Sequence, residues 1–96
     1  MIQSFADDAT KDIYNGVNTK VARRLPKALW PIVRRKLDAL NAANRVELLR
    51  EPPGNHLEAL KGDRAGSWSV RVNDQYRITF RFVDGHAHDV ACEDYH

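Results

Sequence analysis

The sequence predicts an α+β fold, with helices first and an antiparallel meander after them. In the first half of the chain, apolar residues recur at helical spacing. From residue 67 onward they alternate with polar residues, which is the two-residue period of a strand. Glu51–Asn55, which contains two prolines and a glycine, separates the two patterns. Helices followed by strands with short connections are typical of the α+β class.

The amino-terminal segment predicts a short strand and a helix. Ile2–Phe5 is short and apolar, as expected of a first strand. Asp7–Asp12 predicts a helix start, because acidic side chains in a first turn interact favourably with the helix dipole. We expect this helix to end near Asn15–Gly16, since glycine readily terminates helices.

The second helix is the clearest element. Its apolar side chains recur at helical spacing: Leu29, Val33, Leu37 and Leu40. Pro31 inside a helix would remove a hydrogen bond and clash with the preceding turn. The helix therefore either begins near Trp30 or begins near Pro26 and kinks, and it should end within residues 41–44. Residues 46–49 predict one further turn.

The second half of the chain predicts a sheet. Alternating side chains mark strands over residues 67–73 and 76–82, and residues 86–95 form the last strand candidate. Asp84–Gly85 is a turn signal between the last two. Residues 57–60 add a possible short strand.

The alternation also predicts the register of the first hairpin. Val72 pairs with Tyr76 only if the loop is Asn73–Gln75, because partners across a hairpin lie on the same face. This register places Arg71 directly opposite Arg77. Like charges in that position are destabilising unless something compensates them.

Two kinds of compensation are open for this arginine pair. The first is an acid, with Glu58, Asp63 and Asp94 as candidates. The second is a bound phosphate, which a pair of guanidinium groups suits well. Lys61 and Arg64 favour the phosphate if they face the same way.

Composition limits the class of protein. With 96 residues, the chain predicts a single domain over 1–96. No apolar run approaches the roughly 20 residues of a membrane span, and Met1–Phe5 does not resemble a signal peptide. A cytoplasmic protein without membrane contact is therefore expected. Cys92 is the one cysteine, so we expect no internal disulfide and a packing role for its side chain. The sequence shows neither a metal-ligand set nor a cofactor motif.

Positive charge is concentrated in one segment, although the net charge is only +2. No acid lies between Asp12 and Asp38. The segment predicts a basic face for an anionic partner, or alternatively a solvated helix surface. It contains Lys20, Arg23, Arg24, Lys27, Arg34, Arg35 and Lys36.

Asp94, Tyr95 and His96 place an acid, a phenol and an imidazole side by side. RNA can be cut without a metal when such groups transfer protons and nearby cations stabilise the phosphorane. Regular alternation would put Asp94 and His96 on one face and Tyr95 on the other. The Tyr95 and His96 side chains can reach the same substrate only if the strand ends, twists or bulges near Glu93.

Long blocks of the sequence carry a resemblance to a known family: Met1–Phe5, Arg35–Ala43, Pro52–Arg64, Ser69–Ile78 and Asp94–His96. With these blocks the chain resembles the toxins of the RelE/ParE superfamily, and within it the HigB branch. The resemblance implies the RelE-like microbial RNase fold, in which two amino-terminal helices pack on a curved antiparallel sheet.

The same resemblance implies a function. It implies the toxin of a type II toxin-antitoxin system, a ribosome-dependent and metal-independent endoribonuclease that cleaves mRNA in the ribosomal A site and inhibits translation. The implied partners are the 70S ribosome with its mRNA and a HigA-type helix-turn-helix antitoxin. The resemblance implies that operator DNA is bound only by the complex of toxin and antitoxin. Ribosomal RNA, with its dense phosphate, would be the partner of the basic segment.

By matching position, the resemblance implies site residues. Lys61 and Arg77 are implied as the cations at the phosphate and transition state, and Asp94–His96 as the acid/base cluster. Arg71 and Arg64 are expected to bind phosphate or RNA, with Arg71 supported mainly by the hairpin register.

Two other functions stay open. A ParE-like toxin resembles this fold but acts on DNA gyrase without cleaving RNA, and that branch lacks the acid/base cluster. A nucleic-acid-binding module without catalysis would bind and never cut. Cleaved transcripts would distinguish an endoribonuclease from both.

Overall fold

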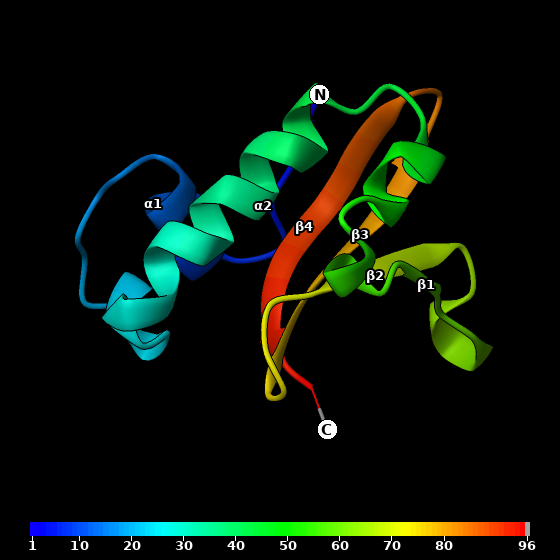
Figure 1. Ribbon diagram of the computed structural model, residues 1–96. Coiled ribbons are helices and arrows are strands. Elements are labelled where there is room, and N and C mark those ends of the chain that lie inside the picture. The colour runs from blue at the N-terminus through cyan, green and yellow to red at the C-terminus, as the bar shows by residue number, and fades with distance from the viewer. Residues whose placement is uncertain (96) are drawn as a thin grey trace.

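The computed structural model describes residues 1–95 and confirms the α+β fold (Figure 1). Within these residues, α1 (Asp8–Tyr14) and α2 (Trp30–Ala42) precede a four-stranded sheet. Each strand pairs antiparallel with the next along the chain: β1 (Glu58–Ala59), β2 (Ser67–Arg71), β3 (Tyr76–Val83) and β4 (His86–Asp94). Short 3-10 turns lie in the connections: η1 (Ala22–Arg24), η2 (Lys27–Leu29), η3 (Val46–Arg50), η4 (Pro53–Asn55) and η5 (Gly62–Arg64).

Both ends of α1 and the start of α2 have local causes that the sequence indicates. The Asp7 side chain accepts a hydrogen bond from the Thr10 amide at 2.8 Å, which caps α1. Gly16 follows this helix with a φ of +76°, a conformation that suits glycine. Of the two predicted starts for α2, the first is correct. Pro31 lies in its first turn, where a missing amide hydrogen costs no intrahelical bond.

The amino-terminal strand prediction is wrong in its extent. Residues 2–5 meet β4 only at two isolated parallel bridges, Ile2 with Ala87 and Phe5 with Val90. Between these bridges β4 has an irregularity at Asp89, whose φ is +54°. This bulge interrupts the ladder, and the segment therefore does not form a continuous strand.

The predicted register of the first hairpin is confirmed. Arg71 pairs with Arg77 across β2 and β3. The Val72 amide donates to the Tyr76 carbonyl at 2.9 Å, which closes the loop over residues 73–75. The Asn73 side chain accepts hydrogen bonds from two amides of this loop region, at 2.9 and 2.7 Å. Asn73 thereby fixes the turn that sets the two arginines opposite each other.

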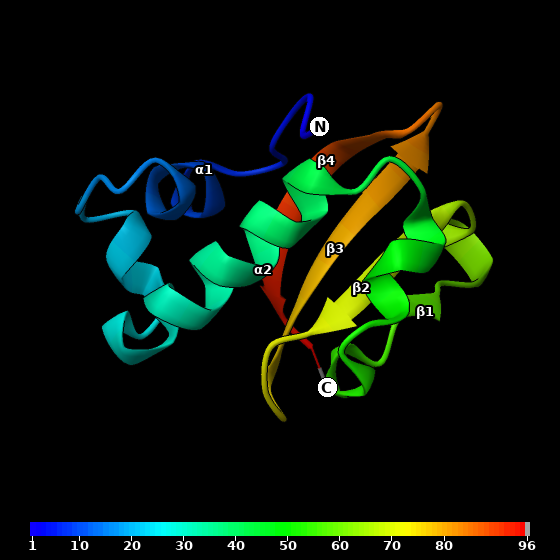
Figure 2. The ribbon, with the colours of Figure 1, turned by 45° about the horizontal axis from the view of Figure 1, so that its top comes forward.

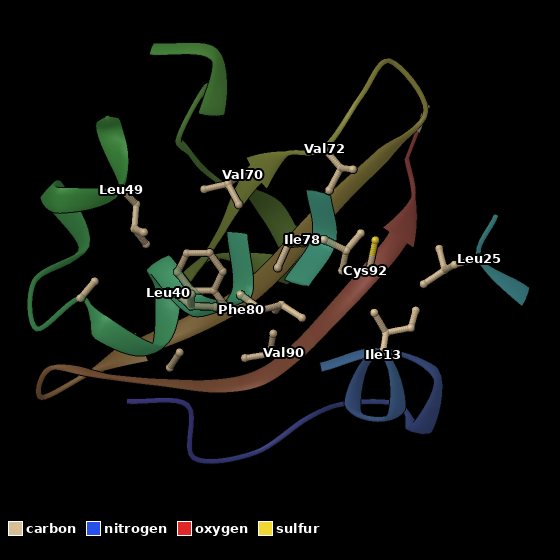
Figure 3. Close-up of a cluster of buried hydrophobic side chains, with 14 of the residues drawn as sticks. Ile13, Leu25, Leu40, Leu49, Val70, Val72, Ile78, Phe80, Val90 and Cys92 are labelled. Atoms are coloured by element: carbon tan, nitrogen blue, oxygen red, sulfur yellow. The ribbon is translucent and has the colours of Figure 1, made fainter. Parts of the chain in front are cut away.

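The helices cover one face of the twisted sheet. α2 runs across this face, and α1 lies beside β4 (Figure 2). Figure 3 shows the core between the two layers, where burying each large apolar side chain contributes roughly 1.5–3 kcal/mol. Its fully buried members include Ile13, Val33, Leu37, Leu40, Ile78, Phe80 and Val90.

Cys92 is part of this core. It is 7% exposed, and burial raises the pKa of its thiol to about 12. The thiol is therefore neutral at physiological pH, which confirms its packing role. None of the helices among residues 1–95 has the length and apolar character needed to cross a membrane.

Candidate functional site

The second face of the sheet, here called the open face, is covered by neither α1 nor α2 (Figures 1 and 2). Alternation along β2, β3 and β4 gives it Ser69, Arg71, Arg77, Thr79 and Glu93. Ser69 and Thr79 pair with each other and are almost completely buried. Arg77 lies one step further along the sheet, between Arg71 on one side and Glu93 on the other. Small polar side chains therefore form a floor, and charged side chains lie around it.

Three hydrogen bonds hold the Arg77 guanidinium. Its Nε donates to Ser69 Oγ at 2.8 Å, and its Nη2 donates to the His56 carbonyl at 2.7 Å and to the Ser69 carbonyl at 3.4 Å. The Tyr95 ring centroid lies 5.9 Å from Arg77 Cζ, within cation–π range. All of these partners are electrically neutral. They orient the positive charge of Arg77 without compensating it.

Arg71, directly opposite, is compensated by an acid from an unexpected place. Its Nη2 contacts Asp74 Oδ1, three residues along the chain in the hairpin loop. An acid does compensate Arg71, as one of the two alternatives predicted, but the structure pairs it with Asp74 and not with the candidates Glu58, Asp63 and Asp94. The tight loop brings Asp74 back beside β2. The pairing register relates residues of the strands only, and it therefore does not reveal a partner in the loop.

Arg64 is paired with Glu93 on the same face. Its two terminal nitrogens donate to the two carboxylate oxygens at 3.1 and 2.6 Å, and the Thr79 hydroxyl donates to the same carboxylate. The hydrogen bonds from Arg64 and from Thr79 lower the pKa of Glu93 against the opposing effect of burial. Because Lys61 directly precedes the turn that contains Arg64, this pair fastens the Lys61 turn to β4 beside Arg77.

The arginines around the open face differ in their compensation. Arg64 pairs with Glu93, Arg71 with Asp74, and Arg81 with Asp89 at 2.8 Å. Among residues 1–95, Arg77 is the member of this group that has no carboxylate partner. No three His, Cys, Asp or Glu side chains in the described part of the chain lie close enough to hold a metal ion. Within residues 1–95, Arg77 is thus an oriented cation without a carboxylate partner beside three arginines in fixed ion pairs, which suits an anion such as a phosphate.

The end of β4 sends neighbouring side chains to opposite sides of the sheet. Tyr95 lies over Arg77 on the open face, and its amide donates to the Gln75 carbonyl at 2.6 Å. Asp94 pairs in register with Tyr76, whose side chain packs on the core. The pairing of β3 with β4 is regular from Thr79 to the end of β4, so no bulge near Glu93 brings Asp94 and Tyr95 to one face.

Asp94 lines a shallow hollow on the helix side of the sheet. It accepts a hydrogen bond from Gln75 Nε2 at 3.1 Å and lines this hollow together with Arg24 and Cys92. His96, the third member of the predicted acid/base cluster, lies outside the described residues. Its role stays a prediction.

The predicted basic face is largely exposed. It lies on the connection between the two helices and on the outer side of α2. The Lys27 ammonium lies 5.7 Å from the centre of the Trp30 ring, and Arg23 donates to the Asn18 side chain at 2.9 Å. The exposed members, here called the basic surface, are Lys20, Arg23, Arg24, Lys27, Arg34 and Arg35.

Lys36 does not belong to this exposed surface. It is half-buried, and its Nζ donates to Asn55 Oδ1. Burial and the nearby charges of Arg35 and Arg71 lower its pKa. The hydrogen bond to the buried Asn55 turns the Lys36 side chain toward the segment before β1 rather than to solvent.

Three residues of this region were not predicted as site residues. Glu93 and Ser69 lie on the same face as Arg77, and strict alternation could have found both. Asn55 lies in an irregular segment, where no periodicity reveals which side chain turns inward. Its burial to 4% exposure is apparent only in the folded chain.

Comparison with known proteins places the chain among bacterial toxins. A family model described as the RelE-like HigB toxin of type II toxin-antitoxin systems matches residues 3–96. Toxin HigB-1 of Vibrio cholerae is 40% identical over 85 residues, which cover 88% of this chain and 87% of the relative. Endoribonuclease HigB of Proteus vulgaris is 37% identical over 98 residues and covers 100% of both chains.

Solved structures share the fold at lower sequence identity. A chain of the YoeB-YefM complex from Staphylococcus aureus has a TM-score of 0.62 at 18% identity, covering 100% of this chain and 98% of its own. The YoeB/ParE toxin from Agrobacterium tumefaciens has a TM-score of 0.55 at 19% identity, covering 98% and 99%. At such identities the similarity shows the fold alone.

Proposed function

The chain belongs to the family of RelE-like HigB toxins of type II toxin-antitoxin systems, and on that premise we propose how it acts. It is the toxin of such a system and, like its relative from Proteus vulgaris, an endoribonuclease. Our proposal is that it depends on the ribosome: it cleaves mRNA in the ribosomal A site without a metal ion and thereby inhibits translation. The cytoplasm is the place where this substrate occurs.

The observation that carries this proposal is the Arg77 guanidinium. Three hydrogen bonds to neutral groups fix its direction, and no carboxylate of residues 1–95 pairs with it. In RNA cleavage, negative charge builds up on the phosphorane. A cation that is already oriented stabilises this charge without having to reorganise during the reaction.

The proposed reaction is transfer of the RNA phosphate to its own ribose. A base removes the proton of the 2′-hydroxyl, the 2′-oxygen bonds to phosphorus, and the bond from phosphorus to the 5′-oxygen breaks. An acid returns a proton to this 5′-oxygen, which leaves a cyclic phosphate and a 5′-hydroxyl. We assign proton transfer to Tyr95 and His96, the phosphorane charge to Arg77 and Lys61, and further RNA phosphate contacts to Arg71 and Arg64.

Asp94 has a different place in this proposal. Its carboxylate lies on the helix side, bound to Gln75, whereas Tyr95 contacts Arg77 on the open face. We propose that Asp94 contributes negative charge at the end of β4 and does not itself take the 2′-hydroxyl proton.

Ribosome binding is proposed to use the basic surface. Contacts of lysine and arginine with rRNA phosphates supply affinity that does not depend on sequence and that weakens with salt. A second proposed partner is a HigA-type helix-turn-helix antitoxin, through whose complex the operator DNA is bound. Two structural neighbours are YoeB-YefM toxin-antitoxin complexes from Staphylococcus aureus, which supports an antitoxin partner of some type.

Mapping of mRNA 5′ ends after brief expression in a bacterium tests the proposal. We expect new ends within translated codons, and these ends should disappear when translation initiation on the transcript is blocked. The Arg77→Ala variant, at equal protein level, is the control. Ends that appear equally on untranslated RNA would contradict ribosome dependence.

The alternative is a non-enzymatic ParE-like toxin that acts on DNA gyrase. The YoeB/ParE toxin from Agrobacterium tumefaciens shares this fold, and the fold is therefore compatible with both functions. A DNA-damage response without new mRNA ends would favour this alternative.

A further inference from the structure

We infer that Asn55 is a positioning residue for Arg77, an inference that rests on the proposed function. Asn55 does not touch Arg77. It fixes the backbone of the irregular segment before β1, and the next residue of that segment supplies the carbonyl that binds Arg77.

The first step is the burial of Asn55. This side chain is 4% exposed, although its neighbours Gly54 and His56 are exposed. Its Nδ2 donates to the Leu49 and Glu51 carbonyls, both at 3.1 Å, and its Oδ1 accepts from the Lys36 ammonium. Every polar atom of the side chain is therefore used to tie the segment to itself and to α2.

The second step is the backbone of His56. It has a left-handed conformation with a φ of 45°, which non-glycine residues adopt infrequently and which costs of the order of 1 kcal/mol or more. This conformation directs the His56 carbonyl toward Arg77 Nη2 at 2.7 Å. Asn55, the preceding residue, is the anchor that holds the chain in this place.

The third step is what Arg77 would lose without this carbonyl. The remaining hydrogen bonds, Nε with Ser69 Oγ at 2.8 Å and Nη2 with the Ser69 carbonyl at 3.4 Å, both come from one residue, and Tyr95 adds only its ring contact. The short bond at Nε would then hold the guanidinium, and its terminal nitrogens would be held less firmly. Because a misplacement of about 1 Å in a reacting group can cost about 10²-fold in rate, loosening this contact should lower the chemical step.

The test is a double-mutant cycle on the single-turnover rate of mRNA cleavage at saturating programmed ribosome. Asn55→Ala should lower this rate about 10- to 100-fold. In the Arg77→Ala background the same change should have almost no further effect, since the group that it positions is absent. A residue with only a structural role would lower both rates by the same factor.

Asn41→Ala is the matched control. Like Asn55, Asn41 uses its side chain to hold backbone: its Oδ1 accepts a hydrogen bond from the Ile2 amide at 2.9 Å, but this contact ties the amino-terminal segment and not the Arg77 site. It should lower the thermal midpoint and leave the cleavage rate within about 2-fold of wild type. If Asn55→Ala does not fold, Lys36→Met removes only the Oδ1 partner of Asn55, and a several-fold fall in rate is then expected.

A spectroscopic readout separates the inference from the proposed function. The 15Nε resonance of Arg77 should shift or broaden in Asn55→Ala and stay in place in Asn41→Ala, whether or not the protein cleaves RNA. Wild-type protein that does not cleave would overturn the proposed function. Cleavage that needs Arg77 but is unaffected by Asn55→Ala, or is lowered equally in both backgrounds, would overturn the inference alone.

Discussion

The open face and the basic surface carry positive charge in two different ways. On the open face, Arg64, Arg71 and Arg81 are each fixed by a carboxylate, and Arg77 is fixed by neutral groups. The basic surface is exposed and comes from a stretch without any acid between Asp12 and Asp38. An oriented charge suits a chemical step. Exposed, flexible cations suit contacts with phosphates of any sequence. Changes in the two regions should therefore affect different steps of the same activity.

The largest expected effect is that of His96→Ala, which removes the proposed proton-transfer group next to Tyr95. The single-turnover cleavage rate should fall about 10²- to 10⁴-fold, the usual scale for a lost general acid or base. Ribosome affinity should stay near that of wild type. A variant that stays fully toxic at equal protein level would remove His96 from the reaction.

Arg77→Ala is the next largest. Loss of one oriented stabiliser should lower the rate about 10²- to 10³-fold, equivalent to about 2.7–4 kcal/mol. Arg71→Ala is the matched control, because Arg71 lies opposite in register but already pairs with Asp74. Arg71→Ala should lower the cleavage rate much less, and it should relieve the repulsion between the two guanidinium groups. Equal losses for the two variants would contradict a special role of Arg77, and an unfolded Arg77→Ala protein would show that the pair is structural.

Charge reversal on the basic surface should affect binding rather than chemistry. Replacing Arg23, Arg24, Arg34 and Arg35 by glutamate should weaken ribosome cosedimentation and flatten its dependence on salt, by nearly one unit of slope for each lost phosphate contact. Binding that is unchanged across the salt series would show that this surface is solvated or contacts the antitoxin. Ribosome recognition would then lie on the sheet.

The smallest effect concerns Glu93 and the pH dependence of stability. Its folded pKa is lowered, so its contribution is present above the unfolded value of about 4.3 and is lost as pH falls through the folded value. Because Arg64 is 44% exposed and Glu93 33%, Glu93→Gln should cost at most about 1 kcal/mol at pH 7. Urea unfolding at pH 7 and pH 3 measures this: the wild-type advantage should shrink at pH 3. An advantage that grows on acidification would contradict the ion pair.

The sequence predicted the parts of this molecule that depend on local pattern. Alternation of side chains predicted the Arg71–Arg77 pairing, since a shift of one residue would have exposed every core side chain of the hairpin. Helical periodicity predicted α2, and the proline rule limited its start to two positions. These features need only neighbours within one or two elements.

The parts that were not predicted depend on contacts between distant segments. Asn55 is buried because α2, η3 and the segment before β1 meet around it, and no pattern in its own segment reveals this. Asp74 compensates Arg71 through the shape of one loop. For Asp94 and Tyr95, the sequence predicted opposite faces if β4 is regular and left open a bulge near Glu93; the bulge lies at Asp89, and the two side chains therefore point in opposite directions.

One measurement tests most directly whether chemistry and docking are separate on this molecule. It is the single-turnover cleavage rate as a function of ribosome concentration, for Arg77→Ala and for the charge-reversed variant of the basic surface side by side. We expect a low plateau with an unchanged half-saturation point for Arg77→Ala. For the charge-reversed variant we expect a wild-type plateau that is reached only at higher ribosome concentration. A normal plateau for Arg77→Ala, with its half-saturation point shifted instead, would show that Arg77 serves docking and not chemistry.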